Sequence, residues 1–168
     1  THTLQGCGNE LNKGIIPRAV EQALRYKQEI EKNKDWSYRV DVSYFEINKE
    51  TIRDLLRNSQ ADNLNHEIKA DYFVSDLQRV SIDSLEKIDE VMSHAARRRS
   101  VSYNDGASLS SSSNMNTSFS CMGCSHSIFT LHLSALNVNH GESLDGTLVF
   151  VDLVGSDESD DVSLAALG

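Results

Sequence analysis

The chain has 168 residues, of which 39% are hydrophobic and 24% charged, the size and composition of one globular domain with a single core. Its formal net charge of −9 at pH 7 argues against nucleic-acid or anionic-membrane binding, which depends on a basic face. With no run of about 20 apolar residues and no signal-peptide pattern, we expect a soluble, cytoplasmic protein.

The first part of the chain predicts a helix, a strand and a second helix. Pro17 suits the first turn of a helix that extends to about residue 32, with one apolar face formed by Val20, Ala23 and Leu24. Residues 37–47 alternate between apolar and polar side chains, which indicates a half-buried strand. Residues 50–57 have helical spacing of Ile52, Leu55 and Leu56. A polar loop over 58–65 and short strands over 66–80 are expected next.

The middle of the chain predicts a long helix and then a loop. Residues 81–99 carry an apolar stripe, and Asp83 with Glu86 suits an N-terminal cap. The basic run Arg97–Arg99 would complement the negative end of the helix dipole, although a partner contact or phosphorylation of Ser100 and Ser102 remains open. Residues 100–120 are rich in serine, and we expect a flexible loop there.

Two strands are predicted at 128–136 and 147–153, where a polar connection can close an antiparallel pair. The apolar run Leu148–Val151 indicates a central strand covered on both faces. Because helices and strands are interleaved along the chain, the fold class is α/β.

Asp152 follows that apolar strand and precedes the turn at Gly155. A carboxylate in this position can hold the water shell of Mg²⁺, and a nearby glycine lets backbone N–H groups approach a γ-phosphate. The alternative is that Asp152 only caps the turn.

Several stretches resemble kinesin motor domains, in the order in which that family has them. They are Thr1–Gly6, Gly14–Arg18, Val42–Ile47, Ile52–Leu56, Ser125–Phe129, Asp152–Asp157 and Ser163–Gly168, and Asn65–Ile68 is similar to C-terminal, minus-end-directed motors. The resemblance implies that residues 1–168 are part of a three-layer P-loop NTPase sandwich whose central, mostly parallel sheet is flanked by helices. It also implies ATP or ADP with Mg²⁺ as ligand, microtubules as partner and a place on the cytoskeleton.

The resemblance also implies roles for individual residues. Thr1 would close the phosphate loop and contact nucleotide and Mg²⁺, Ser125 would end switch I and contact nucleotide, and Asp152 would serve the metal. Gly155 would approach the nucleotide, and Asp157 would take the place of the catalytic switch II glutamate.

Departures from the family pattern lead us to expect impaired catalysis. The chain begins at the last threonine of the phosphate loop, and Met122, Gly123 and Cys124 replace the Ser-Ser-Arg of switch I. Phosphoryl transfer depends on positioning and charge stabilisation, so these losses should lower the rate by orders of magnitude. Residues 158–162 are acidic and should repel an acidic track.

Two functions therefore remain open, and the sequence does not decide whether the chain is an enzyme. It is a portion of a microtubule motor, or a non-catalytic motor-homology module that acts as a scaffold or as a partner in a homodimer, a heterodimer or a coiled coil. A zinc or redox site formed by Cys121, Cys124, His126 and Cys7 is a further alternative, against thiols without a role. The resemblance gives His126 a supporting role.

Overall fold

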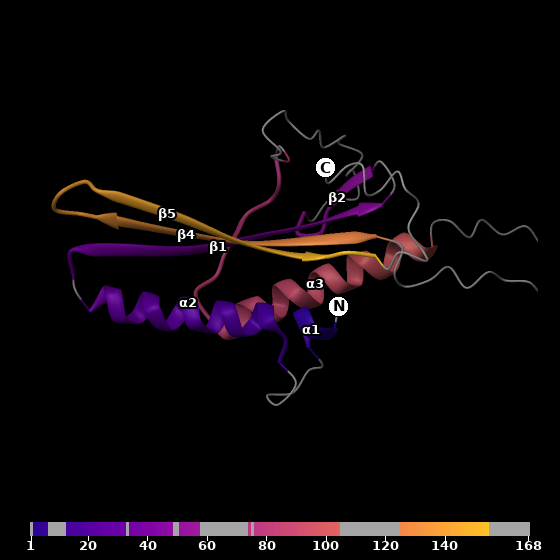
Figure 1. Cartoon of the computed structure of the whole chain (residues 1–168), viewed down its shortest axis with the longest axis horizontal. Coiled ribbons are helices and arrows are strands. Elements are labelled where there is room, and N and C mark those ends of the chain that lie inside the picture. Colours follow the sequence, from indigo (N-terminus) through magenta and orange to yellow (C-terminus); the bar gives the residue numbers. More distant parts are fainter. Residues whose placement is uncertain are drawn as a thin grey trace, which may run out of the picture.

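A computed structural model describes residues 2–6, 13–32, 34–48, 51–57, 74, 76–104 and 125–154. The described elements, in chain order, are α1 (His2–Gln5), α2 (Ile15–Glu31), β1 (Trp36–Asn48), β2 (Thr51–Asp54), β3 (Val80–Ser81), α3 (Leu85–Asn104), β4 (His126–Asn137) and β5 (Ser143–Asp152). The strands form one sheet, and the three helices lie along the same face of it (Figure 1).

The sheet has the strand order β2-β1-β4-β5, and β3 pairs with β1 beside this path. β1 and β4 pair from Trp36↔Asn137 to Ile47↔His126, and β4 and β5 form the predicted hairpin, up to the pair Ser127↔Asp152. The end of β1, the start of β4 and the end of β5 therefore meet at one end of the sheet. This arrangement positions the candidate site.

All described strand pairs are antiparallel, whereas the resemblance led us to expect a mostly parallel sheet. The short connection between β4 and β5 forces this direction, because parallel neighbours need a crossover of a dozen or more residues. The described part of the chain nonetheless combines a sheet with helices packed on it, as the predicted fold class requires.

The core lies between the sheet and the helices. The alternation along β1 places Val40, Val42 and Tyr44 on the helix side, where they pack with the predicted face of α2, namely Val20, Ala23 and Leu24. The ring of Phe129 on β4 packs edge-on against Tyr44 at 5.5 Å between centroids and against Phe150 on β5 at 6.1 Å. An aromatic row thus crosses three strands.

The short helix α1 is held close to α2 and to β1. Gly14 is the N-cap of α2, and a Cβ at this position would collide with the carbonyl group of Leu4. The Gln5 Nε2 donates a hydrogen bond of 2.6 Å to the hydroxyl of Tyr44. Glycine is therefore required where the two helices approach, and α1 is fixed to the centre of the sheet.

The segment that was predicted as a helix over 50–57 instead contains the strand β2. Ile52 pairs with Ile47 in the ladder, and the buried carboxylate of Asp54 closes the following turn. Its Oδ1 accepts the N–H of Leu56 at 2.8 Å, and its Oδ2 accepts the N–H of Gln78 at 2.6 Å. Ladder pairing and these two bonds override the helical spacing of the apolar residues.

Helix α3 begins later and ends later than predicted. Its cap is Ser84, whose Oγ accepts the N–H of Lys87 at 3.2 Å, and not Asp83. The helix continues to Asn104, so the expected loop over 100–120 begins as helix, and the rest of it lies outside the described residues. The Arg97–Arg99 run is consequently not in the last turn, and the predicted dipole role is wrong.

Strand β5 lies at the edge of the described sheet rather than at its centre. Leu148, Val149 and Val151 are 45%, 52% and 45% exposed, so the prediction of cover on both faces is not met within the described part of the chain. The prediction used residue type alone. An apolar run indicates that a strand is buried, but it does not identify the segment that packs against it.

Candidate functional site

The site residues predicted from the sequence converge where β4 starts and β5 ends. Ser125 directly precedes β4, and Asp152 is the half-buried last residue of β5, paired in register with Ser127. The structure therefore brings Ser125 and Asp152 to one end of two neighbouring strands. Thr1, Gly155 and Asp157 lie outside the described residues, so their predicted roles stay predictions.

Glu46 at the end of β1 is a buried carboxylate in this region that sequence reasoning missed. Its Oε2 accepts a hydrogen bond of 3.0 Å from the Ser125 hydroxyl and lies 3.5 Å from Arg99 Nε on α3. Its Oε1 lies 3.9 Å from Arg53 Nη1 on β2. Two cations offset the cost of burying this charge. The sequence did contain a signal for Glu46, because the alternation of the predicted strand places this carboxylate on the core-facing side.

His126 is fully buried and connects the two strand ends. Its Nδ1 accepts a hydrogen bond of 3.1 Å from the backbone N–H of Val154. A nitrogen that accepts carries no proton, so the ring is neutral and its proton is on Nε2. Burial lowers the pKa of His126, which favours this neutral form. Within the described residues, Nε2 has no hydrogen-bond partner.

The chemistry of this end of the sheet suits a hydrated cation better than a fully caged one. Asp152 offers carboxylate oxygens, and no cluster of three or more His, Cys, Asp or Glu side chains suitable for a metal occurs in the described part of the chain. Mg²⁺ commonly keeps several waters and uses one or two carboxylates, so Asp152 fits it. The zinc alternative required Cys7, Cys121 and Cys124, which lie outside the described residues.

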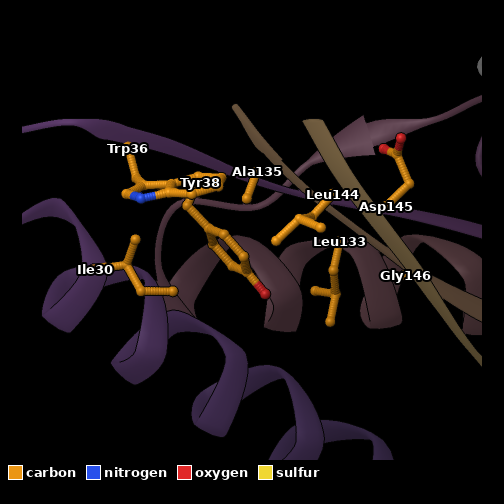
Figure 2. Close-up of a pocket in the computed structure, with 8 residues that line it drawn as sticks. All are labelled: Ile30, Trp36, Tyr38, Leu133, Ala135, Leu144, Asp145 and Gly146. Carbon is orange, nitrogen blue, oxygen red and sulfur yellow. The ribbon is translucent and has the colours of Figure 1, made fainter. Parts of the chain in front are cut away.

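A cavity of about 510 Å³ lies at the other end of the strands, between the hairpin and the end of α2. Figure 2 shows Trp36 and Tyr38 beside Ile30, with Leu133 and Leu144 across from them. This end is roughly 27 Å from Asp152 along β4, at about 3.4 Å per residue. Its lining is mainly apolar, and burial raises the pKa of Tyr38. Such a lining does not match a phosphate ligand.

A second hollow, of about 360 Å³, lies on the sheet face away from the helices. There the Ser43 hydroxyl lies 3.1 Å from Nε2 of His132. Burial and the charge of Arg79 lower the pKa of His132, and Asp41 opposes the shift. This polar group joins β1 to β4.

The comparisons with known proteins agree with the resemblance found in the sequence. Residues 1–165 match the kinesin motor domain family. The chain is 34% identical over 170 residues to the kinesin-like protein KIN-14M of Arabidopsis thaliana, covering 94% of this chain and 21% of that protein. It is 30% identical over 171 residues to carboxy-terminal kinesin 2 of Xenopus laevis, and this match covers 95% of this chain and 24% of that protein. C-terminal kinesins are thus among the relatives, as predicted.

Solved structures show the same likeness in three dimensions. A structure described as a fast kinesin superposes with a TM-score of 0.72 at 33% identity, covering 92% of this chain and 41% of that one. The motor domain of kinesin-like protein KAR3 of Saccharomyces cerevisiae superposes with a TM-score of 0.62 at 32% identity. The match covers 97% of this chain and 45% of that one. The chain therefore spans less than half of these two motor structures and between a fifth and a quarter of the length of the two curated relatives.

The fold predicted from the sequence is confirmed by these structures, which are kinesin motor domains with the P-loop NTPase fold. The described helices include none long and apolar enough to cross a membrane. The length of the family match and the likeness in three dimensions agree, and the chain belongs to the kinesin motor domain family.

Proposed function

We propose that this chain is the part of an ATP-hydrolysing microtubule motor that senses nucleotide at the shared end of β1, β4 and β5. The observation that carries the proposal is the convergence of Ser125, His126 and Asp152 there. The fast kinesin structure is described in terms of an ATPase mechanism and interactions with microtubules, which supports the same activity and partner for this chain and a place on the cytoskeleton.

In this proposal Asp152 holds the water shell of Mg²⁺, and the backbone at Gly155 approaches the γ-phosphate. Thr1 contacts the phosphates and the metal, and Asp157 positions the attacking water. The replacement of the expected switch I Ser-Ser-Arg by Met122–Cys124 removes donors and a cation, so turnover is slow.

A second candidate is a non-catalytic motor-homology module that works as a dimer partner. The same replacement at Met122–Cys124 favours it. A further solved relative, 31% identical with a TM-score of 0.61, is described as the C-terminal motor and motor homology domain of Kar3Vik1 fused to a synthetic heterodimeric coiled coil. That relative combines a motor with a motor homology domain, which supports a heterodimer as the working form under this candidate.

Thermal unfolding with and without Mg·ATP separates the two candidates, using the natural polypeptide that carries this chain. A ligand that binds only the folded state at about 100 times its Kd stabilises it by about 2.7 kcal/mol. For a domain of this size that raises Tm by roughly 5–10 °C. Asp152→Asn should remove the metal-dependent part of the rise. An unchanged Tm with both Mg·ATP and Mg·ADP would reject the motor and favour the module.

A further inference from the structure

We propose that Ser125 and His126 form a two-sided latch that positions the nucleotide-sensing segments instead of contacting the nucleotide. This inference rests on the proposed function for its consequence in turnover. The latch itself rests on two hydrogen bonds in the structure, from Ser125 to Glu46 and from Val154 to His126.

The His126 side of the latch fixes the chain just after β5. Val154 is the residue before Gly155, and its N–H points to Nδ1 of His126 at 3.1 Å. The imidazole is fully buried at the first residue of β4, so it has little freedom to follow a different position of Val154. In this proposal, a displacement of the chain before β4 therefore moves the imidazole of His126, and the hydrogen bond from Val154 moves the chain after β5 with it.

The Ser125 side fixes the same point to the rest of the domain. The Ser125 hydroxyl donates to Glu46, whose carboxylate is also close to Arg99 of α3 and Arg53 of β2. Because its proton is used in this bond, the hydroxyl has only lone pairs to offer elsewhere. A phosphate oxygen needs a donor, so this proposal places the Ser125 hydroxyl in the latch and not on the phosphates.

The decisive comparison is His126→Asn against His126→Leu, because the two side chains have nearly the same shape and only asparagine keeps an acceptor near the Nδ1 position. The first readout is hydrogen exchange at the Val154 amide without nucleotide. Loss of one hydrogen bond should speed this exchange by roughly three- to tenfold in the leucine variant. The asparagine variant should stay close to the unsubstituted protein. Equal exchange in all three proteins would overturn the latch.

The second readout is steady-state turnover with Mg·ATP beside binding of Mg·ADP. The leucine variant should lose about tenfold in kcat with ADP affinity nearly unchanged, since the latch positions the segment that meets the γ-phosphate. Asparagine should restore most of the loss. Equal losses in both variants would show a structural role alone and reject the latch. If the unsubstituted protein binds no nucleotide, the proposed function fails, and the exchange experiment still decides the latch.

A measurement on the unsubstituted protein covers the case in which the leucine variant does not fold. The ¹⁵N NMR shifts of the His126 ring report its tautomer directly. Protonated Nε2 with unprotonated Nδ1 is the expected result, as the bond from Val154 requires. A ring protonated at Nδ1 would contradict the inference.

Discussion

Replacing Glu46 by glutamine tests whether the buried carboxylate organises the candidate site. The Glu46 side chain is 5% exposed, and its partners Arg53 and Arg99 are 28% and 19% exposed. Breaking a buried ion pair from one side costs about 3–5 kcal/mol. Water reaches both arginines in part, so we expect the low end, about 3 kcal/mol, which corresponds to a Tm lower by roughly 6–12 °C.

The assay is urea and thermal unfolding of the Glu46→Gln variant beside the unsubstituted protein. The matched control is Glu90→Gln, since Glu90 pairs with Lys87 at 2.9 Å on the exposed surface of α3. That substitution should leave the urea midpoint unchanged, because exposed pairs contribute little. A loss below about 1 kcal/mol for Glu46→Gln, or one no larger than that of the control, would refute the reasoning.

Further predictions concern the turn after β2, the contact between helices and the response to pH. Asp54→Ala leaves the buried N–H of Leu56 and the part-buried N–H of Gln78 without their acceptor and should cost about 1–3 kcal/mol in urea unfolding, with Asp54→Asn costing less. Gly14→Ala should lower Tm by several degrees, roughly 5 °C or more, because its Cβ meets the backbone of α1. The lowered pKa of His132 means that the unfolded state binds its proton first, so the free energy of unfolding should fall as pH drops below 6.5. His132→Gln should flatten this dependence, whereas an unchanged slope would exclude His132 as its source.

The parts of the fold predicted correctly are those in which a local pattern has one interpretation. The helix over 17–32 and the strand over 37–47 were found because apolar spacing alone separates a helix face from an alternating strand. The short segment 50–57 has helical spacing and was predicted wrongly as a helix, because the long-range pairing of β2 with β1 outweighs a local pattern of so few residues. The N-cap of α3 was predicted wrongly, because Asp83 and Ser84 are equally good N-cap residues by type, and the structure uses Ser84.

The sequence indicated some of the residues that lie at the candidate site, and their roles stay predictions. Asp152 and Ser125 were found from the order of motifs along the chain, and the strand register then placed them at one end of the sheet. Glu46 and the Val154 bond were missed because they join residues distant in sequence. Only the pairing of β1 with β4 and β4 with β5 brings them together.

The exposed strand β5 has a consequence for handling the protein. Its residues 148–151 are apolar on both faces, and it forms the last strand in the described sheet order. A strand of that kind is a template for the addition of another strand, in solution as well as in a native assembly. The exposure of β5 should therefore show first as turbidity and loss of yield at high protein concentration. Charged replacements at Val149 or Val151 offer a direct way to keep the chain in solution for the measurements above.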